Sequence, residues 1–188
     1  MPSKALLFLL VGLPASGKST EARRLEETER ALRLSSDECM IPLFGRDDPD
    51  SKRNVVEAQL ISIGFRAVQL GLNVVLDLGL WSRDERSALV WLAEELGVQP
   101  KIVYLPIDPA TQLERSLRRL AKDPDQVYPV SVERFESFLD YFQEPTPEEI
   151  SGAAAQYQPP PGWVGWSEWA MGRWPSLPHV DRMRTGRD

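Results

Sequence analysis

An apolar run followed directly by a glycine-rich loop constrains the fold of this 188-residue chain more than any other feature. Residues 5–11 read Ala-Leu-Leu-Phe-Leu-Leu-Val, and residues 12–20 read Gly-Leu-Pro-Ala-Ser-Gly-Lys-Ser-Thr. A continuous apolar run of this length indicates a strand that is buried on both faces, as in a parallel sheet. The loop matches the pattern G-x-x-x-x-G-K-[ST], whose backbone N–H groups surround phosphates at the start of a helix. The sequence therefore predicts a phosphate-binding loop at the end of a buried parallel strand.

Strand and helix patterns alternate over the next hundred or so residues. Short apolar runs predict further strands at residues 31–34, 73–77 and 101–105. Helical spacing and capping residues predict helices at residues 18–30, 51–70, 82–97 and 109–121. Because parallel strands need helical crossovers, this order predicts an α/β fold of three layers, with a mostly parallel sheet flanked by helices.

The composition excludes several kinds of chemistry. The chain has one Cys, Cys39, so it cannot form an internal disulfide framework or a multi-cysteine zinc site, and we assign Cys39 no catalytic role. Its one His, His179, lies near the end of the chain, a poor place for preorganised catalysis. A net charge of −6 argues against a general binder of nucleic acid or anionic membranes. No apolar run is long enough to span a bilayer, so cytoplasmic residence is the default expectation.

Several short motifs follow the loop. They are Ser-Ser-Asp at residues 35–37, Val-Val-Leu-Asp at 74–77, Arg-x₃-Arg at 115–119 and Phe-x-x-Pro-Thr-Pro-x-Glu at 142–149. No N-K-x-D motif for guanine recognition occurs, and Leu78 follows Asp77 where motor ATPases usually carry a second acid. Over about residues 4 to 150 the chain resembles the P-loop kinase group, which includes polynucleotide kinases, chloramphenicol phosphotransferase and zeta-toxin-type kinases. The resemblance implies a P-loop NTPase fold similar to nucleotide kinases, with a lid segment.

The loop supplies the expected nucleotide site. The residues expected to bind ATP there are Gly12, Pro14, Ala15, Ser16, Gly17, Lys18, Ser19 and Thr20. Lys18 would reach the β- and γ-phosphates, and Ser19 would ligate Mg²⁺.

Two carboxylates are expected at the carboxyl edge of the sheet, where α/β proteins bind their ligands. The resemblance implies that Asp37 accepts the proton of the acceptor hydroxyl; the alternative is that Asp37 only caps the turn at residues 38–43. Polynucleotide kinases carry an Arg three residues after this Asp, whereas this chain has Met40, which weakens the case for a nucleic-acid acceptor. Asp77 would hold Mg²⁺ or orient the acceptor; the alternative is an ordinary residue at a strand end.

Arginines are expected to complete the cleft. The resemblance implies that Arg115 and Arg119, one helical turn apart, belong to a lid that closes on the ATP phosphates. The alternative is a solvated helix face whose arginines, Arg118 among them, pair with Glu114 and Asp123. Arg86 could also face the cleft, whereas solvation is the expected fate of Arg83.

The composition changes after Glu144, where prolines and tryptophans become frequent. We expect a kinase domain at residues 1–150 and a Pro/Trp-rich C-terminal extension at residues 151–188 that packs on its core. Four tryptophans of the extension, Trp163, Trp166, Trp169 and Trp174, either form a flap over the core or line an apolar acceptor pocket or a subunit interface.

The expected function is transfer of the γ-phosphoryl group of ATP, with Mg²⁺, to a hydroxyl group of a small molecule. A polynucleotide or nucleoside 5′-hydroxyl kinase is the nearer alternative, and a non-catalytic ATP-binding sensor is the more distant one. We expect a monomer or homodimer with no membrane partner.

Overall fold

The computed structural model describes residues 5–45, 50–122, 138–153 and 158–185. Its sheet has four parallel strands in the order β2-β3-β1-β4. The strands are β1 (Leu6–Val11), β2 (Leu32–Ser35), β3 (Val74–Gly79) and β4 (Gln99–Tyr104). The apolar run at residues 5–11 is the central strand β1, and the predicted parallel sheet is confirmed.

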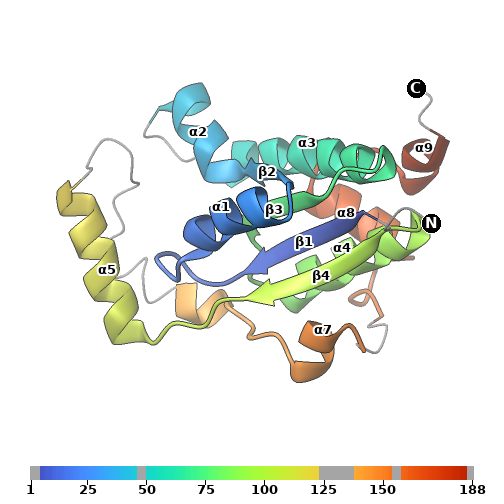
Figure 1. The fold of residues 1–188 in the computed structure, drawn as a ribbon. Coiled ribbons are helices and arrows are strands. Elements are labelled where there is room, and N and C mark those ends of the chain that lie inside the picture. The colour runs from blue at the N-terminus through green and yellow to red at the C-terminus, as the bar shows by residue number, and fades with distance from the viewer. Residues whose placement is uncertain (1–4, 46–49, 123–137, 154–157, 186–188) are drawn as a thin grey trace.

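Helices cover both faces of the sheet (Figure 1). They are α1 (Lys18–Thr28), α2 (Ser36–Phe44), α3 (Asp50–Gln69), α4 (Arg83–Glu95), α5 (Pro109–Lys122), α7 (Pro147–Ser151), α8 (Trp166–Arg173) and α9 (Val180–Thr185). Alternate residues of β1 point to opposite faces. Phe8 and Leu10 pack with Ala22 and Leu25 of α1, whereas Leu7 and Leu9 belong to the cluster that contains α3, α4, α8 and α9. The three layers predicted from the sequence are therefore present.

Local capping signals place several helix starts correctly. Ser82 and Glu85 form the reciprocal capping box that begins α4, and Asp108 accepts a hydrogen bond from the backbone N–H of Thr111 in α5. The segment after β2 differs from the expected short turn, because α2 already begins at Ser36 and its N-cap is Ser35. Asp37 therefore lies in the first turn of α2, and its predicted alternative role as the cap is wrong.

Side chains near the C-terminus take part in the larger hydrophobic cluster. Trp166, Ala170, Trp174, Leu177, Val180 and Met183 are all buried in it. Trp174 is completely buried and its Nε1 donates to the Glu57 carboxylate of α3. Trp163 remains partly exposed and packs against Gly172, where a Cβ atom would lie 2.4 Å from its ring. Residues 166–183 thus complete the layer that α3 and α4 form on this face of the sheet.

A buried ion pair joins α4 to α7. The guanidinium of Arg86 is fully buried, with Nε 2.9 Å from Glu149 Oε1, and its Nη1 donates to the carbonyl groups of Leu80 and Trp81. The suggestion that Arg86 faces the cleft is wrong, because its donors are engaged by Glu149 and by the chain that leaves β3.

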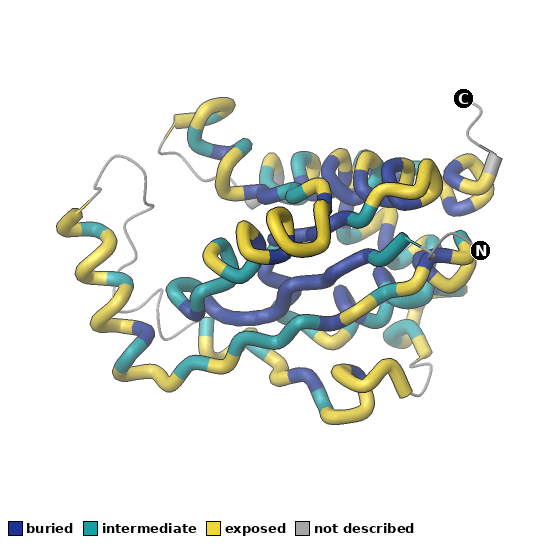
Figure 2. Tube along the Cα trace, viewed as in Figure 1, coloured by how far each residue is buried: buried dark blue, intermediate teal, exposed yellow. Residues whose placement is uncertain are grey.

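Burial follows this layering. Figure 2 shows the central strands β1 and β3 mostly buried, the edge strands β2 and β4 less so, and α5 mostly exposed. No helix among the described residues is both long and apolar enough to cross a bilayer.

Candidate functional site

The glycine-rich loop is tightly folded between the strand ends and α1. Gly12 has a φ of +156°, and a Cβ atom there would lie 2.8 Å from the carbonyl oxygen of Leu105 and 2.7 Å from Ser16 Oγ. Gly17, with a φ of +99°, precedes α1 as its N-cap. Only glycine fits position 12 without displacing the loop or the β4 chain. The loop pattern predicted this compact turn.

The loop presents donors to its interior. The first hydrogen bonds of α1 run from the N–H groups of Thr20 and Glu21 to the carbonyl of Gly17, so the N–H groups of Lys18 and Ser19 lie ahead of the helical ladder. Ser16 Oγ is buried and has no hydrogen-bond partner among the described residues. Unpaired donors at a helix N-terminus suit an anion. The residues present therefore fit a phosphate chain.

Lys18 is held across the loop. Its Nζ donates to the carbonyl of Leu13 at 2.8 Å. Burial lowers the pKa of Lys18, the charges of Asp77 and Asp37 act to raise it, and the charge of Arg119 also lowers it. The two carboxylates therefore act on the ammonium group of Lys18, as does one of the two expected lid arginines.

Asp77 lies within β3, two residues before its last residue Gly79, and opposite Ser35 of β2 in the strand register; the expected strand end at Asp77 is therefore wrong. Burial raises the pKa of Asp77; the Lys18 charge lowers it, the Asp37 charge raises it, and hydrogen bonding by the Ser19 hydroxyl lowers it. No group of three or more His, Cys, Asp or Glu ligands occurs in the part of the chain that the structure describes. One hydroxyl and one carboxylate beside a phosphate site nevertheless fit Mg²⁺, which takes most of its ligands from phosphates and water.

Asp37 extends into solvent at the same edge of the sheet. Its side chain is 74% exposed, and its Oδ1 accepts a hydrogen bond from Arg53 Nη1 at 2.9 Å. Met40, at the position where polynucleotide kinases carry an Arg, is fully buried in the core. Arg53 could not be found from the sequence, because its contact with Asp37 depends on how α3 packs against α2.

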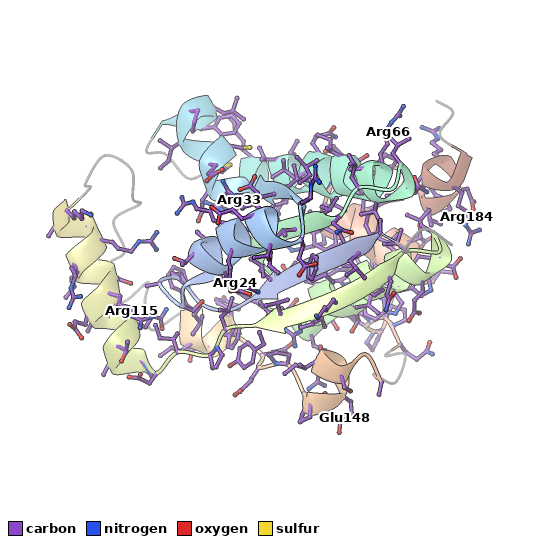
Figure 3. All side chains as sticks on the ribbon, in the orientation of Figure 1. Arg24, Arg33, Arg66, Arg115, Glu148 and Arg184 are labelled. Carbon is purple, nitrogen blue, oxygen red and sulfur yellow. The ribbon has the colours of Figure 1, made fainter. Side chains whose placement is uncertain are left out.

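The two predicted lid arginines lie on α5, which stands away from the sheet at the carboxyl ends of the strands (Figure 1). Figure 3 labels Arg115 on this helix. Arg115 lines an open cleft of about 510 Å³ together with Tyr104, Asp108 and Glu144. Burial and hydrogen bonding with Glu144 raise the pKa of Tyr104 to about 12.

Arg118, which lies between the two predicted lid arginines on α5, forms an ion pair with Glu114 one turn earlier in the same helix. The expected pairing with Glu114 is thus present for Arg118. Asp123, the other expected partner, lies outside the described residues.

Trp81 is a second residue that sequence reasoning missed. Its Nε1 donates to the carbonyl of Gly12 at 3.2 Å, and its ring contacts Phe138 at a centroid distance of 4.9 Å. Gly79 leaves room for this ring, because a Cβ atom there would lie 2.9 Å from Trp81 Nε1. Trp81 therefore braces the start of the phosphate loop, a role that no spacing in the sequence signals.

Solved structures share this architecture. A candidate kinase from Chloroflexus aurantiacus is 20% identical, with a TM-score of 0.64 over 77% of this chain and 84% of its own. A chain of the Pnkp1/Rnl/Hen1 RNA repair complex is 19% identical, with a TM-score of 0.61 over 73% of this chain and 43% of its own. Kti12 from Chaetomium thermophilum, in complex with ADP-AlF3, is 19% identical, with a TM-score of 0.58 over 75% of this chain and 82% of its own. These likenesses show the fold.

No curated protein matches this sequence. A family model, AAA_33, described as an AAA domain, matches residues 7–145, a range that includes the phosphate loop, Asp37, Asp77 and the arginines of α5. The family match and the kinase-like neighbours confirm the resemblance to P-loop kinases that the sequence suggested. By this match over most of its length, the chain belongs to the AAA_33 family of AAA domains.

Proposed function

We propose that the protein is an ATP-dependent kinase that transfers the γ-phosphoryl group to a hydroxyl group of a small molecule. One observation carries the proposal: Lys18, Asp37 and Asp77 come from three separate elements and act on one another electrostatically at the phosphate loop. A phosphate site with one buried carboxylate and one accessible carboxylate suits phosphoryl transfer, which depends mainly on positioning and electrostatics.

In this proposal the loop amides and Lys18 hold the β- and γ-phosphates of ATP. The acceptor oxygen attacks the γ-phosphorus, the bond between that phosphorus and the β,γ-bridging oxygen breaks, and ADP leaves. The proton of the acceptor hydroxyl moves to Asp37, whose accessible carboxylate can reach a ligand in solvent.

Ser19 and Asp77 would hold Mg²⁺ at the phosphate site. When bound, that ion neutralises charge on the β- and γ-oxygens. Burial raises the pKa of Asp77 and the Lys18 charge acts to lower it, so Lys18 favours the anionic form that a cation needs.

Arg115 and Arg119 would approach the phosphates from α5. Planar guanidinium groups bind phosphate oxygens bidentately and stabilise the charge that spreads during transfer. The cleft that Arg115 lines begins at Tyr104, the last residue of β4, and in this proposal the nucleoside part of ATP lies there.

The test is transfer of labelled γ-phosphoryl from ATP to a panel of hydroxylated metabolites and antibiotics. The proposal predicts a labelled small-molecule product with the wild-type protein and none with Lys18→Ala, which loses the phosphate-binding ammonium. Labelling only of a 5′-hydroxyl oligonucleotide would favour the polynucleotide kinase instead. ATP binding that no acceptor converts into turnover would favour the sensor.

A further inference from the structure

Arg53 lies beside the proposed base and has no role in the proposed chemistry so far. It comes from the first turns of α3, which packs against α2. Its Nη1 donates to Asp37 Oδ1 at 2.9 Å and to Ser36 Oγ at 3.2 Å. Ser36 is 2% exposed, so the guanidinium is fixed on its inner side by a buried hydroxyl while Asp37 extends outward. The pair therefore presents a cation and a carboxylate together at the carboxyl edge of the sheet.

The ion pair between Arg53 and Asp37 contributes little to the stability of the fold. The Asp37 side chain is 74% exposed and that of Arg53 is 21% exposed. An ion pair with a largely solvated partner contributes little to stability, because water competes for both charges. The arrangement is better explained by what a cation does for a ligand that binds to Asp37.

Arg53 also acts on an acid of its own helix, because its charge acts to lower the pKa of Glu57 against the effect of burial. Glu57, one turn further along α3, lies 3.6 Å from Arg173 and accepts a hydrogen bond from Trp174 Nε1. Lys52, the preceding residue, places its Nζ 4.8 Å from the centre of the Phe44 ring. The nine residues of α2 include no basic side chain, so α3 supplies the cation that lies beside Asp37.

The distances limit which acceptors can use both groups. An acceptor hydroxyl hydrogen-bonded to Asp37 at about 2.7 Å lies within about 6 Å of Arg53 Nη1. An anionic group one or two carbon atoms from that hydroxyl can then reach the guanidinium. Guanidinium groups match carboxylates and phosphates in shape and bind them with paired hydrogen bonds.

We infer that Arg53 recognises an anionic group of the acceptor, so that the acceptor is a small hydroxyl compound with a carboxylate or phosphate close to the reacting hydroxyl. The inference rests on the proposed kinase function. It deepens that function by specifying that the acceptor carries a negative charge and that Arg53 of α3 binds this charge. The step itself is unchanged: the hydroxyl oxygen bonds to the γ-phosphorus, its proton moves to Asp37, and ADP leaves.

Matched acceptors of one carbon skeleton test the inference. Glycerate, glycerol 3-phosphate and glycerol form one set; gluconate, glucose 6-phosphate and glucose form another. The inference predicts that the wild-type protein prefers an anionic member to its neutral partner. Within each set, comparing the carboxylate with the phosphate shows which of the two anions the site binds better. Arg53→Gln should raise the KM for that acid by about tenfold or more, with a smaller change in the KM for ATP and in kcat. Arg53→Lys should recover part of the loss.

Arg66→Gln is the matched control, because Arg66 is exposed at the far end of the same helix (Figure 3). This substitution should leave kcat and the KM values for ATP and for the acceptors unchanged. Equal losses for anionic and neutral acceptors in Arg53→Gln would overturn the inference, since Arg53 would then act only on Asp37. A preference for a 5′-hydroxyl oligonucleotide over every small acid would also overturn it.

Calorimetric binding of the same compounds, to protein loaded with a non-hydrolysable ATP analogue, separates this inference from the kinase proposal. If no compound is phosphorylated, the kinase proposal fails, but tighter binding of an acid that Arg53→Gln abolishes still supports anion recognition. If no acid binds or reacts better than its neutral partner, the inference fails even where a neutral acceptor is phosphorylated.

Discussion

Asp77 lies near the end of β3 with its carboxyl group almost out of solvent; burial raises its pKa and the Lys18 charge acts to lower it. The effect is mutual, because Asp77 and Asp37 oppose the lowering of the Lys18 pKa by burial. Each group therefore favours the charged form of the other against the effect of burial. A polyphosphate and Mg²⁺ bound in the proposed way would add several negative charges and a divalent cation to this set.

Replacing Asp77 separates its two candidate roles. If Asp77 holds Mg²⁺, Asp77→Asn should raise the Mg²⁺ concentration that half-activates ATP turnover by about tenfold or more, because an amide is a weaker ligand for this ion. A Mg²⁺ titration at saturating ATP measures the effect. Asp181→Asn, on α9, is the control and should show the wild-type requirement. An unchanged Mg²⁺ requirement with a raised KM for the acceptor would instead mean that Asp77 contacts the acceptor.

The phosphate loop was predictable from sequence at the level of single residues, and its surroundings were not. The spacing of Gly12, Gly17 and Lys18 is a local pattern with one structural solution. Arg53 and Trp81 reach the site through contacts between elements, and nothing near them in the sequence signals those contacts. Arg86 looked like a cleft residue because it follows Asp77, but Glu149, its partner, lies 63 residues away.

At the scale of elements, α5 places three arginines within five residues, and their surroundings differ. Arg119 acts on the Lys18 charge, whereas Arg118 pairs with Glu114. If α5 serves as the lid, Arg119→Gln should lower kcat by about tenfold or more, because a cation near the transferring group is lost. Arg118→Gln, the same change one residue earlier, should leave kcat at the wild-type value. Equal effects of the two changes in steady-state kinetics would refute a specific role for Arg119.

We expect the ion pair between Arg86 of α4 and Glu149 of α7 to stabilise the fold. Glu149→Gln leaves the fully buried Arg86 without its counter-charge, so the free energy of unfolding should fall by about 3–5 kcal/mol. Urea denaturation measures this change. Glu148→Gln is the control, because Glu148 is exposed on the same short helix (Figure 3) and should change stability little. A stability of Glu149→Gln equal to that of the control would mean that the ion pair is dispensable.

At the scale of the whole molecule, one ion-pair cluster joins elements that are distant in sequence. Glu57 of α3 and Glu85 of α4 both approach Arg173 of α8, at 3.6 and 2.7 Å. Burial raises the pKa of Glu57 to about 7, against the opposing effect of Arg173. The two helices and residues 166–183 therefore meet at a group that titrates near neutral pH.

This cluster predicts how stability varies with pH. The folded protein binds the Glu57 proton more tightly than the unfolded chain, in which the pKa is about 4.5. The contribution of Glu57 to stability is thus complete below pH 4.5 and is lost as the pH rises to about 7. The loss amounts to about 3 kcal/mol.

Glu57→Gln should remove this part of the pH dependence, which denaturation at several pH values would reveal. Glu168→Gln, at an exposed position of α8, should keep the wild-type profile. Parallel profiles for wild type and Glu57→Gln would contradict the assignment.

The layers of the molecule could be predicted from the sequence, but the contacts that join them could not. Hydrophobic spacing is a local property, so β1, β3 and most helices were found close to their observed bounds. The place of Trp174 in the core could not be read from spacing, because Glu57, its hydrogen-bond partner, lies 117 residues earlier. The early start of α2 was missed because Ser35 and Ser36 look like the end of a strand.

The role of Asp37 decides whether this fold acts as a kinase in the way proposed. The decisive measurement is transfer of labelled γ-phosphoryl from ATP to the best acceptor, by wild type, Asp37→Asn and the control Glu38→Gln. Glu38 follows Asp37 in the same turn of α2 and pairs with Arg33. We expect Asp37→Asn to bind ATP normally and to transfer phosphoryl about a hundredfold or more slowly, while Glu38→Gln remains near wild type. Transfer at the full wild-type rate by Asp37→Asn would contradict its role as the base.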